Sequence, residues 1–172
     1  MKYIKRVPII SIALFLFLAT PSYGQVDNFR DASVDYSFNL PDPKWKMTVK
    51  PSPRSPNVEY VFVDRNDGHM EVRKLSTPRD TIMTDVVRDE EQKLQFLPGF
   101  VAGKEERFDG KLSGTVYNYE YVKSGRNMSG RQYFLRVNGT TVYVLRFTGA
   151  RDKLRSIRNQ TDSIARTFEV EG

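Results

Sequence analysis

The sequence has no cysteine and a single histidine, His69, among its 172 residues. Without a thiol the chain has no disulfide, no disulfide-linked partner, no cysteine nucleophile and no site for a bacterial lipid anchor. One imidazole excludes a histidine-rich metal site and a relay of histidines. The glycine- and serine-centred motifs of phosphate loops, dinucleotide folds and serine hydrolases are missing too. These absences favour a protein without a cofactor and without catalytic activity.

Long apolar runs are also scarce, and the clearest one lies at the N-terminus. It extends from Ile9 to Ala19, after three basic residues and before the small residues Ser22 and Gly24. This order is typical of a signal peptide, and the run is shorter than the roughly 20 residues that span a bilayer. We therefore expect residues 1–24 to be a signal peptide cleaved near Gly24, which makes the protein secreted or periplasmic. An uncleaved anchor is the alternative.

The surplus of positive charge is modest. The formal net charge is +6, and the expected signal peptide carries three of the 27 basic residues and none of the 21 acidic ones. Its removal leaves 24 basic and 21 acidic residues, a net charge of +3. Nucleic-acid binders usually show a denser basic patch, so we expect no nucleic-acid partner. A protein partner or an anionic envelope surface fits this charge better.

The first strand signal follows a polar segment, residues 25–33, which we expect to be a flexible leader. Apolar and polar residues alternate from Val34 to Leu40 and predict a strand. A Pro-Asp-Pro turn ends it, because proline lacks a backbone donor and fixes φ. Trp45 then opens a second strand, residues 45–49. We expect Trp45 to seal the end of the core with its indole N–H bonded to an acceptor, rather than to stack on a ligand.

The rest of the chain alternates between strand and helix patterns, separated by turn residues such as Asn, Asp and Gly. Residues 34–171 are long enough for one domain. The pattern predicts an α+β fold, in which an antiparallel sheet of about six or seven strands lies between two main helices. The expected elements are strands at 58–64 and 69–75 joined by a turn at 65–68, a helix from Thr77 to a break at Leu97–Gly99, strands at 101–108, 112–123, 129–137 and 141–148, a helix at 151–166 and a short strand at 167–170.

One candidate binding surface is a row of tyrosines. Tyr117, Tyr119 and Tyr121 occupy alternate positions of a predicted strand and share one of its faces. Aromatic faces stack on rings and sugars, so this tyrosine row is a candidate partner-binding or ligand-binding surface. Ordinary packing under a helix explains the same pattern, and the sequence leaves both interpretations open.

A second candidate surface is a stripe of arginines. Arg151, Arg155 and Arg158 stand at i, i+4 and i+7 of the predicted C-terminal helix, so they share one side of it. This arginine stripe fits an acidic partner or an anionic lipid surface. A solvated helix face without a partner is the alternative.

The stretch YSFNLPDPKW, residues 36–45, is an aromatic-rich strand that ends in proline, with a tryptophan four residues after Pro41. A hairpin, a helix, a long antiparallel meander and a C-terminal helix follow it. This order, from Val34 to Val170, resembles the PsbP and DcrB superfamily. The resemblance implies an αβα sandwich and a binding or accessory role, since members include extrinsic subunits of photosystem II, a nuclear-transport factor that binds a Ran GTPase, envelope proteins and chaperones for secreted effectors. These members share no set of binding residues, so none is carried over.

These observations lead to three alternative hypotheses for the function. The first is an exported, non-catalytic binding or accessory module that acts through protein–protein contacts. The second is a carrier of a small apolar or aromatic ligand, held between helix and sheet against the tyrosine row. The third is a hydrolase that uses a carboxylate pair, which requires two acids about 5 to 10 Å apart in one cleft.

Overall fold

Two antiparallel sheets and three helices make up the part of the chain that the structure, a computed structural model, describes, residues 27–171. The predicted signal peptide lies outside these residues. The elements are, in chain order, β1 (Asp27–Arg30), β2 (Tyr36–Leu40), β3 (Trp45–Val49), β4 (Val58–Phe62), β5 (Asp64–Ser76), α1 (Met83–Leu94), β6 (Val101–Asp109), β7 (Ser113–Lys123), β8 (Arg126–Asn138), β9 (Thr141–Ala150), α2 (Arg151–Ser156), α3 (Arg158–Thr167) and β10 (Glu169–Val170).

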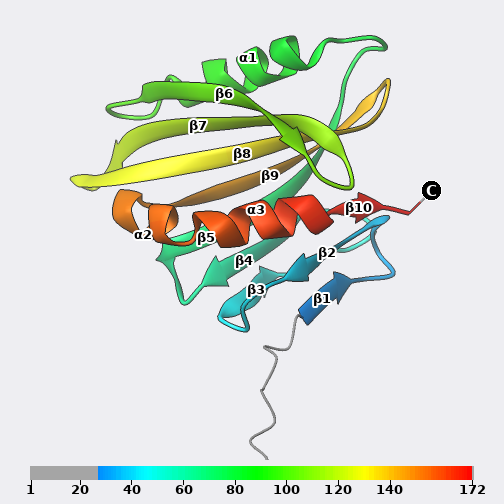
Figure 1. Cartoon of the computed structure of the whole chain (residues 1–172), viewed down its shortest axis with the longest axis horizontal. Helices are drawn as coiled ribbons and strands as arrows, with labels where there is room; N and C mark the ends of the chain where they lie inside the picture. The colour runs from blue at the N-terminus through cyan, green and yellow to red at the C-terminus, as the bar shows by residue number, and fades with distance from the viewer. Residues whose placement is uncertain (1–26, 172) are drawn as a thin grey trace, which may run out of the picture.

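The larger sheet forms the middle layer of the molecule (Figure 1). Its seven strands follow the order β3-β4-β5-β9-β8-β7-β6, and every neighbouring pair is antiparallel. Helix α1 covers one face, and α2, α3 and the small sheet β1-β2-β10 cover the other. The predicted α+β sandwich, with a sheet of six or seven strands between two main helical layers, is confirmed.

The sheet separates two apolar cores. The larger core lies under α2, α3 and the small sheet and contains most of the aromatic rings, among them Tyr36, Phe38, Trp45 and Phe168. The second, here called the α1 core, lies between the sheet and α1. Both faces of the central strands are therefore buried. Within residues 27–171 no helix is long and apolar enough to cross a membrane.

The expected flexible leader, residues 25–33, contains a strand. β1 (Asp27–Arg30) pairs antiparallel with β2 along its whole length. Phe29 is 4% exposed and stacks on Phe38 with ring centroids 4.7 Å apart. The expectation of a flexible leader is therefore wrong for Asp27–Arg30. The sequence does not predict this strand because only one of its side chains, an aromatic ring, is buried, so no alternating pattern results.

Trp45 seals one end of the larger core, as the sequence predicts. It is 3% exposed, and its indole N–H donates a hydrogen bond to Oε1 of Gln160 in α3 at 2.9 Å. Its ring centroid lies 5.3 Å from that of Phe62 and 6.0 Å from that of Phe147. The indole thus fills the space beside the proline turn and ties α3 to the end of β3.

The reversal between β4 and β5 differs from the expected turn at 65–68. The chain turns at Val63, which has a φ of 62°, and β5 already begins at Asp64. The Asp64 carboxylate accepts hydrogen bonds from the backbone N–H groups of Asn66 and Asp67, at 2.6 and 3.0 Å. These bonds form a local turn within the strand, so residues 65–68 become a bulge in β5 instead of a hairpin loop.

Two helix boundaries also differ from the sequence-based expectation. Helix α1 begins at Met83 and not at Thr77, because Asp80 has a φ of 63°, which a right-handed helix excludes. The C-terminal helix is interrupted at Ile157, whose φ of −103° and ψ of 14° separate α2 from α3. Ile157 is 5% exposed, so its packing into the larger core accompanies the break.

Candidate binding cleft

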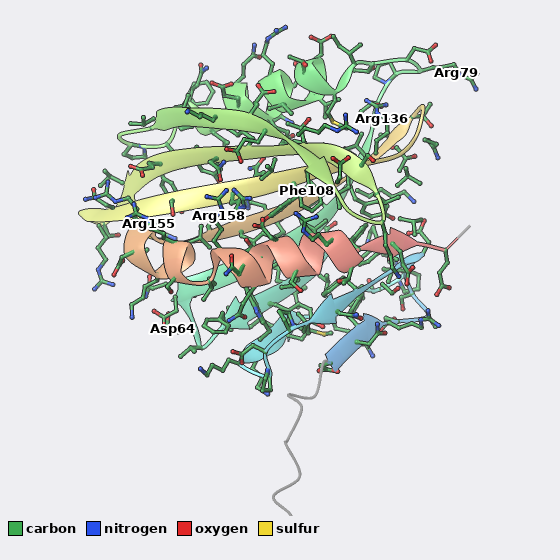
Figure 2. The ribbon with its side chains drawn as sticks, viewed as in Figure 1. Asp64, Arg79, Phe108, Arg136, Arg155 and Arg158 are labelled. Carbon is green, nitrogen blue, oxygen red and sulfur yellow. The ribbon has the colours of Figure 1, made fainter. Side chains whose placement is uncertain are left out.

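A cleft of about 440 Å³ lies between the large sheet and the helices α2 and α3. Its sheet wall comes from β6, β7 and β8, and its helix wall from α2 and the first residue of α3. Figure 2 shows two residues of the helix wall, Arg155 and Arg158, beside these strands. The antiparallel hairpins β6-β7 and β7-β8 form one wall, and the helix that follows β9 directly forms the other.

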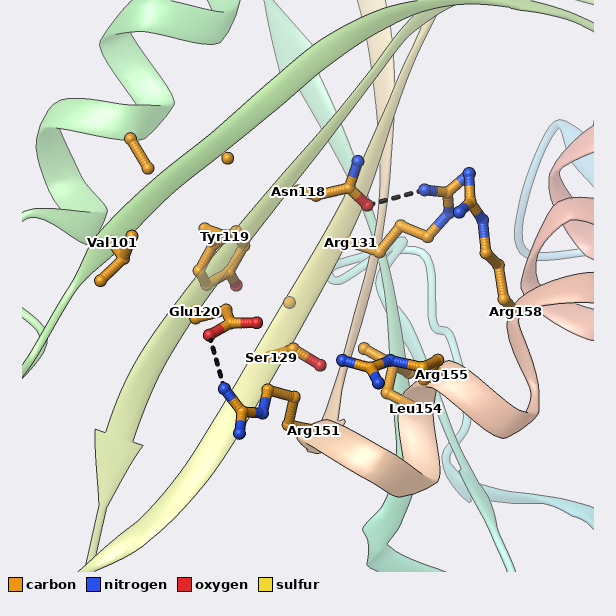
Figure 3. A pocket seen from close by; sticks show the side chains of 13 residues that line it. Val101, Asn118, Tyr119, Glu120, Ser129, Arg131, Arg151, Leu154, Arg155 and Arg158 are labelled. Carbon is orange, nitrogen blue, oxygen red and sulfur yellow. Dashed lines mark hydrogen bonds and ion pairs between the residues drawn. The ribbon is translucent and has the colours of Figure 1, made fainter.

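Four arginines line the cleft. The arginine stripe of the sequence, Arg151, Arg155 and Arg158, occupies the helix wall, and Arg131 of β8 joins it from the sheet wall. In Figure 3 the side chains of Arg151 and Arg155 extend from α2 toward the strands. The three predicted arginines are thus brought together on one concave surface, where all three remain exposed.

Arg131 is fixed in the sheet wall by three partners. Its side chain is 8% exposed and donates to Oδ1 of Asp162 at 2.7 Å, to Oδ1 of Asn118 at 2.7 Å and to the hydroxyl of Tyr133 at 2.6 Å. The Tyr133 hydroxyl in turn donates to Asp162. Burial alone would lower the pKa of Arg131, but Tyr133 and Asp162 outweigh it and raise that pKa. The guanidinium therefore stays charged, and its contacts attach α3 to β8.

Two ion pairs link the helix wall to the strands, one to Glu120 in the cleft lining and one to Glu106 of β6, which is not a lining residue. Arg151 lies 3.2 Å from the Glu120 carboxylate of β7, and Arg158 lies 3.6 Å from the Glu106 carboxylate of β6. All four side chains are about half exposed, and pairs of this kind contribute only about 0–1 kcal/mol. Within residues 27–171 Arg155, which stands between the two pairs in the chain, forms no ion pair of 4.0 Å or less.

The tyrosine row lies in the α1 core. Tyr117 and Tyr119 are each 2% exposed, Tyr121 is partly buried, and successive rings stack with centroids 6.0 and 5.9 Å apart. Burial raises the pKa of Tyr119 to about 12, so its hydroxyl stays protonated. Of the two interpretations, packing under a helix describes Tyr117 and Tyr119; these rings present no face to a partner, although Tyr119 borders the cleft.

An ion cluster around the buried Glu90 side chain lies between α1 and the sheet. Glu90 of α1 is 5% exposed and accepts hydrogen bonds from Arg73 at 2.9 Å and from Lys93 at 2.5 Å. Burial alone would raise the pKa of Glu90, but the bonds from Lys93 and Arg73 lower it below its usual value near 4.5. Side chains thus occupy the space in which the carrier hypothesis places a ligand.

The hydrolase hypothesis requires two acids in one cleft. Among the described residues that line the cleft, Glu120 is the only carboxylate, whereas the hydrolase hypothesis requires two. His69 is 6% exposed and lies 2.8 Å from Glu59 and 3.0 Å from Arg65. Between residues 27 and 171 no group of three His, Asp or Glu side chains is placed to hold a metal ion.

Sequence reasoning missed Arg131 and Glu120, which line the sheet wall, and Glu106 of β6, which pairs with Arg158. A signal for Arg131 was present, because Arg131 is in phase with Tyr133 and Leu135, two apolar-face residues of the same strand. An arginine in the apolar phase of a strand indicates a buried, paired cation. No comparable signal identifies Glu106 and Glu120, since an exposed glutamate in a strand is common.

Comparisons with known proteins identify the fold. Neither a protein-family model nor a curated protein matches the sequence. The Ran-binding protein Mog1p of Saccharomyces cerevisiae has a TM-score of 0.60 and 11% identity, and the match covers 86% of this chain and 96% of that one. LpqN, involved in cell envelope biogenesis of Mycobacterium tuberculosis, has a TM-score of 0.56 and 18% identity over 87% of this chain and 93% of that one.

A cyanobacterial protein has a similar TM-score. Cyanobacterial PsbP (CyanoP) from Synechocystis has a TM-score of 0.56 and 16% identity, and the match covers 84% of this chain and 92% of that one. Such low identities carry no information on function, but the shared order and packing of elements do define a fold. The chain therefore has the PsbP-like fold that its sequence resemblance implies.

Proposed function

We propose that the chain is an exported, non-catalytic binding or accessory module that recognises a protein partner through the arginine-lined cleft. The observation that carries this proposal is Arg155, a cation without an ion-pair partner among the described residues, in a concave site. Arg151 and Arg158 beside it are held only by exposed ion pairs. Arginine is the side chain best suited to hold carboxylates or other anions through paired hydrogen bonds.

Two further observations support a binding role. The charged groups with the greatest burial, Arg131 and Glu90, already have structural partners, which favours a rigid scaffold over a reaction centre. Solved structures with the same fold include a Ran-binding protein and a protein involved in cell envelope biogenesis. The signal-peptide pattern of residues 1–24 supports export.

Affinity capture from an envelope extract tests the role of the cleft. The immobilised protein is compared with a triple variant, Arg151→Gln, Arg155→Gln and Arg158→Gln, and with Arg79→Gln, which removes one exposed charge elsewhere. We expect a protein that the wild type and Arg79→Gln retain and the triple variant loses, with release at about 0.5 M salt because screening weakens exposed ion pairs. Turnover of a panel of hydrolase substrates without any retained protein would refute the proposal.

Export and cleavage of the signal peptide are tested separately, by the mass of the protein. The mass of the protein isolated from its native cells is expected to correspond to a chain that begins at or near Gln25. A mass that still includes Met1–Gly24 would contradict cleavage of the signal peptide, and recovery of that species from the membrane fraction would indicate an anchor instead.

A further inference from the structure

The cations of the helix wall are spread along a line. Arg151 and Arg158 hold two different carboxylates, Glu120 and Glu106, on two different strands. Glu106 lies opposite Val116 of β7, four residues from Glu120, which corresponds to about 13 Å along a strand. Arg151 and Arg155 are four residues apart in α2, about 6 Å along the helix, and Arg158 follows the break at Ile157. A ligand that engages all three arginines therefore needs several acidic groups along its length, and a single phosphate is too small.

An extended peptide has this spacing. Side chains at alternate positions of an extended chain lie on one side and about 6.8 Å apart. Three carboxylates at positions i, i+2 and i+4 then span about 13 Å, the same length as the estimate for Glu106 and Glu120 along the strands. Glu106 and Glu120 already show how a carboxylate engages the outer two arginines, so an acidic segment can replace both and add a third carboxylate at Arg155.

Glu120 in the cleft and Glu106 beside it argue against a membrane as the occupant. A flat anionic surface that covers the cleft meets Glu106 and Glu120 as well as the arginines, and both glutamates are about half exposed. A single chain that lies along the helix wall contacts the cations and leaves these carboxylates on its other side. The arrangement of charge thus favours a narrow acidic segment.

The edge of the sheet offers a second kind of contact. Strand β6 is the last strand of the large sheet among the described residues, so its outer backbone groups pair with no further strand there. Its first residues, Val101 to Gly103, border the cleft, and Val101 is 59% exposed. An extended segment that passes β6 can therefore form main-chain hydrogen bonds and cover an apolar side chain.

We propose that the cleft binds an extended acidic peptide segment with carboxylates at alternate positions. Arg155 makes the first contact, and Arg151 and Arg158 exchange Glu120 and Glu106 for carboxylates of the ligand. This inference rests on the proposed function and adds the chemistry of the partner segment to it.

Fluorescence anisotropy with a labelled peptide tests the inference on the purified protein. The probe alternates Glu and Thr over nine residues, and the control probe has Gln in place of every Glu. We expect the acidic probe to bind at least about tenfold more tightly than the control probe. The difference is expected to shrink as salt rises, because exposed charges are screened.

Three single variants locate the binding site. Arg155→Gln is expected to weaken binding of the acidic probe about fivefold or more. Glu120→Gln removes the internal competitor of Arg151 and is expected to strengthen binding about twofold. Arg79→Gln removes the same charge as Arg155→Gln at a distant exposed position (Figure 2), so binding should be unchanged. Thermal unfolding of each variant verifies that it is folded.

Several outcomes would overturn the inference. One is an equal loss of binding in Arg79→Gln and Arg155→Gln, which would indicate a general charge effect. A second is inorganic phosphate that displaces the probe as effectively as unlabelled peptide does. A third is vesicles of phosphatidylglycerol that bind with the same dependence on Arg155, which would make a lipid surface the occupant.

The two proposals fail in different ways. If the triple variant loses a captured envelope protein but the acidic probe does not bind, the acidic-segment inference is wrong and the protein-binding function stands. If the probe binds through Arg155 but no envelope protein depends on the stripe, the inference stands and the proposed function is wrong.

Discussion

Removal of the Glu90 charge tests whether α1 is held to the sheet by an ion cluster as well as by apolar packing. The Glu90 side chain is 6% exposed, its partner Arg73 is 24% exposed and Lys93 is 67% exposed. A hydrogen bond between charged, mostly buried groups contributes about 1.5–3 kcal/mol. The exposed Lys93 adds about 0.5 kcal/mol at most. We therefore expect Glu90→Gln to lower the free energy of unfolding by about 2 kcal/mol.

Urea unfolding followed by the fluorescence of the single tryptophan, Trp45, measures this loss, because the indole is buried in the native state. The matched control is Asp89→Asn, which removes one exposed negative charge from the same helix and is expected to change the free energy of unfolding by less than about 0.5 kcal/mol. A loss below about 0.5 kcal/mol in Glu90→Gln, or equal losses in the two variants, would refute an ion cluster that stabilises α1.

Three further predictions concern stability. The pKa of Glu90 is lowered in the folded state, so its contribution to the free energy of unfolding is complete above its usual pKa near 4.5 and is lost as the pH falls through the folded value. The difference in urea midpoint between wild type and Glu90→Gln should therefore shrink below pH 4.5. A difference independent of pH would contradict this. Trp45→Phe leaves the Gln160 side-chain oxygen without its hydrogen-bond donor and should lower the free energy of unfolding in urea by about 2 kcal/mol. An unchanged urea midpoint would show that Trp45 does not stabilise this end of the core. Gly130→Ala places a Cβ 2.0 Å from Cζ of the buried Tyr119 ring and should lower the free energy of unfolding by about 1–3 kcal/mol. An unchanged melting temperature would contradict this.

The sequence predicts most of the strands well, because the alternation of apolar and polar residues can be read from neighbouring positions alone. Trp45–Val49 is found with the expected bounds, and the four long strands from β6 to β9 lie within three residues of the expected positions. Helix and turn boundaries are less well predicted because they depend on contacts with distant residues. Ile157 interrupts the C-terminal helix where it packs into the larger core, and no local breaker residue marks this position.

The candidate site is predicted only in part, for a similar reason. The arginine stripe is visible as a helical spacing, and the structure places it in a cleft. Whether the tyrosine row is a surface or a core layer depends on where α1 lies, and the spacing of tyrosines along a strand does not contain that information. The sheet wall of the cleft, with Glu120 and with Glu106 nearby, is created by the pairing of β6 with β7 and is visible only in three dimensions.

The break at Ile157 packs on a glycine of β5 that is far from the cleft arginines in the sequence. Gly68 lies beneath this break, and a Cβ there would meet Cδ1 of Ile157 at 2.8 Å and Cβ of Phe62 at 3.1 Å. A larger residue at Gly68 requires the Ile157 side chain or Phe62 to move, beside the joint between α2, which carries Arg151 and Arg155, and α3, which begins with Arg158. If the cleft binds the proposed acidic segment, such a mutation in the β5 bulge is expected to change the affinity for that segment although no residue that lines the cleft is altered.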